Sequence, residues 1–117
     1  MDGLYYTRQH EWVRFSGRTA YIGLTGKSLQ GDVVYIELPV TGKSVGSGEP
    51  CARVESVKAI TSVCSPVAGF ISAVNDSVFD DPDIITRSPL STWLFKVECE
   101  GEAETGELLT ESEYHEI

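Results

Sequence analysis

The fold of this chain is decided by the stretch PCARVESVKAITSVC, residues 50–64. The segments 51–56 and 60–64 contain residue types that favour β-strands. Turn-forming residues precede the first segment and follow the second. Two such runs around a short gap predict an antiparallel hairpin with Val57 and Lys58 at its turn. A lysine at a hairpin tip is presented to solvent, where an enzyme can acylate its ε-amine and make the side chain a long, uncharged tether. The hairpin alone leaves open the simpler interpretation, an ordinary exposed lysine.

Most of the remaining chain also consists of short strand-like segments separated by glycine, proline or asparagine. Residues 10–15 follow a period of two, with His10 and Trp12 on one face and Val13 on the other, which predicts a half-buried strand. The predicted strands are residues 10–15, 19–24, 33–38, 51–56, 60–64, 68–74 and 93–98. This rhythm of short strands and turns is typical of a small all-β sandwich or barrel.

Helix is predicted only in short peripheral pieces. Residues 26–31 allow little more than one turn, which Gly31 could end. Thr110 and Glu113 have the spacing of a capping box, which predicts a brief helix near the C-terminal end. Residues 76–91 contain Pro82 and Pro89 and are expected to form a long surface connection.

Length and charge limit the organisation and the partners. The 117 residues predict one domain, with a motif-bearing core over about residues 5–97 and an acidic segment over residues 98–117. Nine Lys and Arg against eighteen Asp and Glu give a net charge of −9, which repels phosphate backbones and argues against nucleic acid as a partner. No run approaches the ~20 apolar residues of a membrane helix, so we expect no membrane partner. We expect the chain to work as a monomer in a bacterial cytoplasm.

The acid is concentrated after Lys96, because no Lys or Arg follows it. Two interpretations stay open, a solvated tail that aids solubility and a face that docks basic partner enzymes. The acidic residues of this segment are Glu98, Glu100, Glu102, Glu104, Glu107, Glu111, Glu113 and Glu116.

The cysteines and histidines indicate neither a metal site nor a disulfide framework. Cys51, Cys64 and Cys99 form no Cys-x-x-Cys pair, and His10 and His115 are too few for a cluster. If Val57 and Lys58 are the central turn residues, residues whose numbers sum to 115 face each other, so Cys51 faces Cys64. We expect three free thiols buried as small hydrophobic groups.

No self-sufficient active site can be assembled from the sequence. The run at residues 46–48 has two glycines but lacks the Gly-Lys-Ser/Thr ending of a phosphate loop, and no Gly-x-Ser-x-Gly elbow occurs. This absence supports a carrier without enzymatic activity of its own, although it does not by itself identify one. In a carrier the chemistry belongs to a cofactor and to partner enzymes.

Several motifs, in order along the chain, carry a family resemblance. They are YTRQHEW (residues 6–12), GDVVYIELP (31–39), ESVKA (55–59), SPVAG (65–69), VN (74–75) and WLFKV (93–97). Together they resemble the H protein of the glycine cleavage system, a lipoyl carrier, over roughly residues 5–97.

The resemblance implies a small barrel-sandwich hybrid of the lipoyl/biotinyl-carrier type, with lipoate bound covalently to Lys58. It implies recognition of the site through five neighbouring motif residues, and it makes Glu11 a candidate for docking the amine of the loaded arm. The recognition residues are Glu55, Ser56, Val57, Ala59 and Gly69. The implied partners are glycine decarboxylase, aminomethyltransferase, dihydrolipoyl dehydrogenase and a lipoate ligase or octanoyltransferase. The aminomethyl group would pass from the decarboxylase to the aminomethyltransferase.

Two alternatives to this function remain. The first is an H-like protein that relays lipoate to 2-oxoacid dehydrogenases. It is motivated by departures from the family pattern, since the first helix is short and Ser62 stands where relatives often have an acid. The second is a biotinyl carrier, which Val57 and Ala59 disfavour because biotin carriers typically have methionine beside the lysine.

Overall fold

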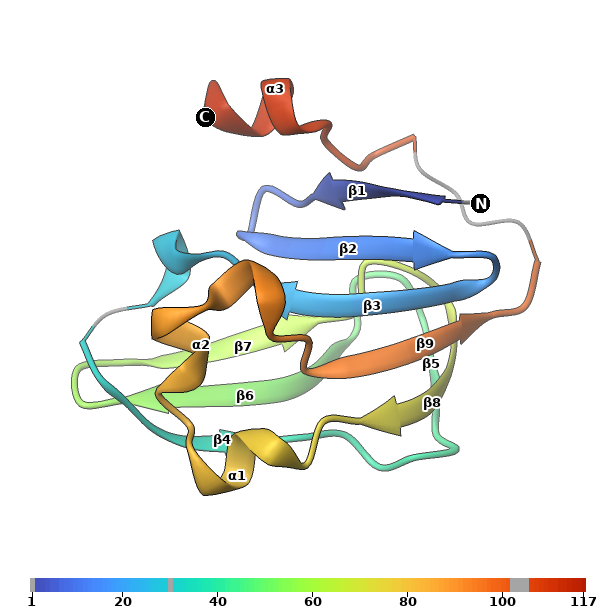
Figure 1. Cartoon of the computed structure of the whole chain (residues 1–117). Helices are drawn as coiled ribbons and strands as arrows, with labels where there is room; N and C mark the ends of the chain where they lie inside the picture. The colour runs from blue at the N-terminus through green and yellow to red at the C-terminus, as the bar shows by residue number, and fades with distance from the viewer. Residues whose placement is uncertain (1, 30, 102–105) are drawn as a thin grey trace.

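The computed structural model describes residues 2–29, 31–101 and 106–117, which form two antiparallel sheets and short helices (Figure 1). One sheet has the strand order β1-β2-β3-β9-β8-β5 and the other β4-β6-β7. The strands are β1 (Asp2–Tyr6), β2 (Glu11–Ser16), β3 (Thr19–Leu24), β4 (Val33–Glu37), β5 (Ser44–Val45), β6 (Pro50–Ser56), β7 (Ile60–Cys64), β8 (Gly69–Val74) and β9 (Phe95–Cys99). The helices are α1 (Ser77–Asp80), α2 (Ile84–Arg87) and α3 (Glu111–His115), with 3-10 turns at Gly26–Ser28 and Pro89–Ser91. The predicted all-β class with short peripheral helices is confirmed.

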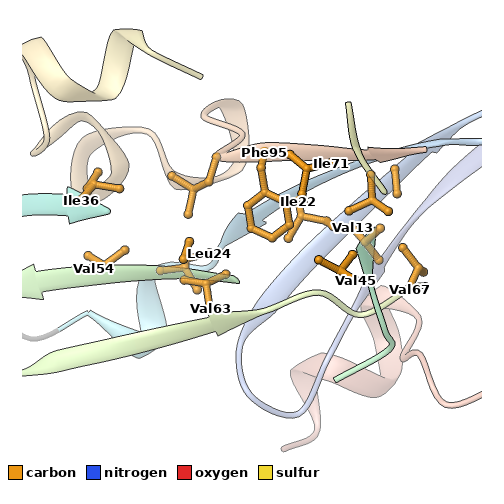
Figure 2. Close-up of a cluster of buried hydrophobic side chains, with 14 of the residues drawn as sticks. Val13, Ile22, Leu24, Ile36, Val45, Val54, Val63, Val67, Ile71 and Phe95 are labelled. Carbon is orange, nitrogen blue, oxygen red and sulfur yellow. The ribbon is translucent and has the colours of Figure 1, made fainter. Parts of the chain in front are cut away.

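The principal core lies between the two sheets (Figure 2). Alternate residues of each strand point inward, because successive side chains of a strand face opposite sides. Strands of the six-stranded sheet supply residues such as Ile22 and Phe95, and the three-stranded sheet supplies Ile36, Val54 and Val63, all fully buried or nearly so. The hairpin that carries Lys58 is therefore anchored by the inner face of its own sheet.

The prediction of a half-buried strand holds from Val13 to Ser16, where buried and exposed residues of β2 alternate, but it fails at Trp12, which a second cluster covers. Trp12 and Val13 are neighbours on opposite faces, yet both are completely buried. Trp12 packs in a cluster with Tyr6, Leu109 and Tyr114, and its indole nitrogen donates a hydrogen bond to the Pro89 carbonyl at 2.9 Å. The periodicity could not show this, because Leu109 and Tyr114 of this cluster come from a distant part of the chain.

His10 also departs from its predicted place beside Trp12. Its backbone has φ 70° in the turn between β1 and β2, and β2 begins only at Glu11. The His10 ring stands edge-on to Tyr114 and its Nδ1 lies 2.7 Å from the Tyr114 hydroxyl. Tyr114 lies on α3, whose Thr110 cap and Glu113 form the predicted capping box.

Residues 76–91 are not the plain surface connection that the prolines predicted. They form α1, α2 and the 3-10 turn at Pro89–Ser91. Val78 and Ile85 are almost completely buried and belong to the principal core. The segment therefore closes one edge of the core rather than lying free in solvent.

The predicted hairpin is confirmed, but its register changes near the open end. Arg53↔Ser62, Val54↔Thr61 and Glu55↔Ile60 pair as expected, whereas Pro50, not Cys51, pairs with Cys64. A bulge at Cys51 absorbs one residue, so the two cysteines do not face each other. Cys51, Cys64 and Cys99 are free thiols. Only Cys99 is buried; Cys51 and Cys64 are half-buried, contrary to expectation.

Among the described residues no helix is long and apolar enough to cross a membrane.

Candidate functional site

Lys58 is exposed and lies in the turn between β6 and β7, two strands that Figure 1 shows as a hairpin. The Ser56 backbone N–H donates to the Ala59 carbonyl at 2.9 Å, so Val57 and Lys58 are the two central residues of the turn. The Ser56 hydroxyl oxygen accepts a hydrogen bond from the Ala59 N–H at 3.1 Å and lies 3.4 Å from the Lys58 N–H. It also lies 3.1 Å from the Ala59 carbonyl, to which it donates. The Ser56 side chain thus stabilises the turn through hydrogen bonds to the turn's own backbone.

The outer face of the three-stranded sheet continues from the turn. Tyr35, Glu55 and Ile60 lie side by side across β4, β6 and β7 and share this face, because directly paired residues point the same way. The Arg53 Nε lies 3.7 Å from Glu55 Oε1 and ties that carboxylate to the sheet. Val57 and Ile60, each 65% exposed, flank Lys58 with apolar surface. A protein that acts on Lys58 meets these side chains first.

Glu11 is not near the turn but at the far end of β7. Its side chain is only 2% exposed, which excludes the simple case of an exposed strand acid. Oε1 accepts a hydrogen bond from the Thr7 hydroxyl at 3.0 Å, and Oε2 accepts one from the Cys64 N–H at 2.6 Å. Because Glu11 begins β2 and Cys64 ends β7, this carboxylate links the two sheets.

The electrostatic state of Glu11 follows from its burial. Burial raises the pKa of the Glu11 carboxyl above its ordinary value, and the hydrogen bonds from Cys64 and Thr7 only partly oppose this. The described residues supply no Lys or Arg within ion-pair distance of it. The site therefore favours either a proton on Glu11 or a cation beside it.

Replacement of Glu11 by glutamine is expected to remove a pH dependence from the free energy of unfolding. A raised folded-state pKa means that the folded chain binds this proton more tightly than the unfolded chain. The stabilisation is complete below the unfolded pKa and is lost as pH rises through the folded pKa. Wild type should therefore lose stability relative to Glu11→Gln across that window, with a slope of at most about 1.4 kcal/mol per pH unit. Urea unfolding at a series of pH values measures this.

The control for that measurement is Glu107→Gln, which removes one negative charge from an exposed position. The difference in the free energy of unfolding between Glu107→Gln and wild type corrects for the change in net charge. Parallel pH curves for wild type and Glu11→Gln would contradict the expectation and would mean that Glu11 titrates alike in the folded and unfolded chains.

A surface groove borders Glu11 and the end of β7. Its lining includes Thr7, Glu11, Cys64 and Ser65, together with Leu109 near α3. No residue of the Lys58 turn lines it. A tether on Lys58 must extend along the length of β7 to reach this groove.

Gly69 lies in the other sheet, at the start of β8, and the structure does not bring it to Lys58. The turn lies at one end of the molecule in Figure 1, whereas β8 lies toward the other. A Cβ added to Gly69 would stand 2.1 Å from the Glu98 carbonyl oxygen on β9. The glycine is therefore required for the close approach of two strands.

The structure thus gathers Glu55, Ser56, Val57 and Ala59 around Lys58 and separates Gly69 and Glu11 from it. Two neighbours of the turn that the sequence did not identify as site residues are Gly31 and Asp32. The Val57 N–H donates to the Asp32 carbonyl at 3.1 Å, and the backbone of Gly31 lies against the Val57 side chain. Both residues belong to the motif at residues 31–39, but no local sequence pattern indicated that they lie next to the Lys58 turn.

No group of three or more His, Cys, Asp or Glu side chains that could hold a metal ion occurs within residues 2–29, 31–101 and 106–117.

Known proteins resemble this chain over nearly its whole length. The family profile described as "Glycine cleavage H-protein" matches residues 4–117. The glycine cleavage system H protein of Thermoanaerobacter sp. (strain X514) is 40% identical over 116 residues, which cover 97% of this chain and 92% of the relative. The one from Thermotoga maritima is 41% identical over 115 residues, covering 96% and 93%.

A solved structure agrees with these relatives. The crystal structure of a glycine cleavage system H protein from Mycobacterium marinum matches with a TM-score of 0.86 at 34% identity, covering 97% of this chain and 94% of that one. This match bears out the predicted barrel-sandwich fold. The chain belongs to the glycine cleavage H-protein family.

Proposed function

We propose that this chain carries lipoate as an amide on the ε-amine of Lys58. Membership of the H-protein family bears out the sequence prediction of a glycine cleavage system carrier protein. The observation that supports Lys58 as the attachment point is its place at the exposed centre of a two-residue turn that Ser56 closes. An amine held there in solvent is open to acylation, and the arm formed on it points away from the fold.

The chain's own residues present and recognise the attachment point. Ser56 and Ala59 fix the turn, while Glu55 and Val57 offer the attaching enzyme one charged and one apolar contact. That enzyme is a lipoate ligase or an octanoyltransferase. Gly69 contributes indirectly, because it allows β8 and β9 to pack closely.

The partners of the carrier are glycine decarboxylase, aminomethyltransferase and dihydrolipoyl dehydrogenase. When attached, the lipoyl group supplies a disulfide that can accept an aminomethyl group and be regenerated. The protein serves these enzymes as one domain over residues 1–117, as a monomer. Its three free thiols fit a reducing compartment such as a cytoplasm.

Glu11 is proposed to hold the protonated amine of the loaded arm. It borders the groove at the far end of β7, and its buried carboxylate has no Lys or Arg partner among the described residues. A cation arriving on the arm would supply the missing opposite charge. A charge-assisted hydrogen bond of this kind contributes about 1.5–3 kcal/mol.

Glu11→Gln is accordingly expected to speed the non-enzymatic loss of the aminomethyl group by roughly tenfold to hundredfold. Glutamine keeps the shape of the side chain but removes the charge that holds the amine. Ammonia release from the loaded carrier measures the effect, and lipoylation of Lys58 should be unchanged. Equal release rates would mean that the amine does not dock at Glu11.

The carrier function itself is tested by reconstitution. The lipoylated chain should support glycine-dependent release of carbon dioxide by glycine decarboxylase, and the chain without lipoate should not. A chain that is lipoylated yet inactive here, but donates lipoate to a 2-oxoacid dehydrogenase domain in the presence of a lipoyl transferase, would favour lipoate relay instead.

A further inference from the structure

The backbone of Gly31 and Asp32 lies against the lysine turn, although it is distant in sequence. Asp32 accepts a hydrogen bond from the Val57 N–H at 3.1 Å, one residue before Lys58. Next to it Val33 pairs with Ser56, so the contact continues the β4–β6 ladder up to the turn. The Val33 N–H lies 3.3 Å from the Asp83 carboxylate beside α2, which ties this segment to the body of the fold.

Gly31 permits this contact because it has no side chain. Its φ is 80°, and a Cβ on it would stand 2.9 Å from Val57 Cγ2. The same Cβ would lie 3.8 and 3.9 Å from Cγ and Cδ of Lys58, in ordinary contact with the lysine stem. Even alanine at position 31 would therefore push the Val57 side chain aside, next to the base of Lys58.

We propose that Gly31 and the Asp32 carbonyl are positioning residues for the acylation of Lys58. They hold Val57 in place, so that the lysine stem leaves the turn in one direction. The inference rests on the proposed attachment of lipoate to Lys58 and adds residues outside the hairpin to that site. When the nucleophile is already held in one orientation, the attaching enzyme does not bear the entropic cost of selecting that orientation from many others.

Gly31→Ala is the test variant, and Gly48→Ala is its matched control. Gly48 has φ 84°, so alanine there suffers the same kind of backbone strain, but its Cβ would meet nothing within 4 Å. Both variants should lose a similar amount of stability from the strain. Because Val57 is 65% exposed, it can yield outward in Gly31→Ala without unfolding the chain.

The rate of lipoylation separates the two variants. With a purified lipoate ligase, lipoate and ATP, followed by intact mass, Gly31→Ala should lower kcat/KM by about tenfold to hundredfold. Gly48→Ala should remain within about twofold of wild type when both are assayed well below their Tm. Adding Val57→Ala to Gly31→Ala removes Cγ2, the atom that the new Cβ would strike, and should restore most of the rate while the stability loss remains. Val57→Ala alone corrects for any contact that the ligase makes with Val57.

Hydrogen exchange gives a second readout that needs no ligase. The Val57 amide should exchange at least tenfold faster in Gly31→Ala than in wild type or Gly48→Ala, because its bond to Asp32 is displaced. Equal lipoylation rates for Gly31→Ala and Gly48→Ala, or no recovery in the double variant, would overturn the inference alone. Absence of any adduct on the wild-type chain would overturn the proposed attachment site together with the inference.

Discussion

Lys58→Arg is expected to abolish lipoyl attachment completely. Arginine keeps the positive charge and a similar reach, but its guanidinium stays protonated at any working pH and does not act as the nucleophile that an amide bond requires. Wild type treated with a lipoate ligase should gain one lipoyl adduct by intact mass, and the variant none. Lys43→Arg, at another exposed lysine, is the matched control and should gain the adduct at the wild-type rate.

The surroundings of the other lysines support a single adduct. The Lys27 ammonium lies 4.8 Å from the Tyr114 ring centre. The Lys96 ammonium lies 4.7 Å from the Tyr21 ring centre and 4.9 Å from that of Trp93. Lys43 is 3.9 Å from a Glu49 carboxylate oxygen. Among the described residues, Lys58 is the lysine without such a contact. A lipoyl adduct that is still found on Lys58→Arg would mean that the attachment site is one of these three other lysines.

Gly69→Ala is expected to destabilise the fold by about 3 kcal/mol or more, at the upper end of overpacking effects. The added Cβ would stand 2.1 Å from the Glu98 carbonyl oxygen and 2.9 Å from its carbon. Both are backbone atoms of the neighbouring strand, which cannot rotate away as a side chain can. Relief requires β8 and β9 to separate, and that loosens the sheet. The loss should appear as a Tm lower by roughly 10 °C or more.

Gly46→Ala is the control for this variant, because its Cβ would come only within 4.0 Å of a Glu49 carboxylate oxygen. It should unfold close to the wild-type temperature. At a low temperature at which the Gly69→Ala variant remains folded, it should still accept lipoate, because the role of Gly69 is structural. A variant with wild-type stability but no lipoylation would instead make Gly69 a recognition residue.

The Lys58 turn could be predicted because its determinants are local. Two strand-like runs and a two-residue gap define the hairpin within a short window of sequence. The bulge at Cys51 could not be predicted in this way. Next to the bulge, hydrogen bonds between the flanking loops fix the start of β6 and the end of β7. The Ser65 N–H donates to the Glu49 carbonyl at 2.9 Å, and the Gly48 N–H donates to the Ser65 carbonyl at 2.7 Å. Those bonds set the register shift, and no residue pattern reports them.

The burials that the sequence pattern did not reveal have a different cause. Glu11 has the appearance of a strand acid because its decisive partner, the Cys64 N–H, is far along the chain. Val78 and Ile85 lie in helices of four residues, too short to show a helical period, and the nearby prolines suggested a loop. Strand β1 has no alternation that marks it, and its pairing with β2 and contact with Leu109 depend on the finished fold. In each case long-range packing decided what local pattern could not.

The strand order has a consequence for how the chain folds. In the six-stranded sheet β3 lies beside β9, so Thr19 pairs with Glu98 across most of the sequence. The β6–β7 hairpin needs only a two-residue turn to close. Closing a longer loop costs more entropy, and pairings between distant segments slow the folding of β proteins. The turn that bears Lys58 can therefore form within microseconds, whereas β1-β2-β3 and β9-β8 join into one sheet only after residues 95–99 have paired with β3.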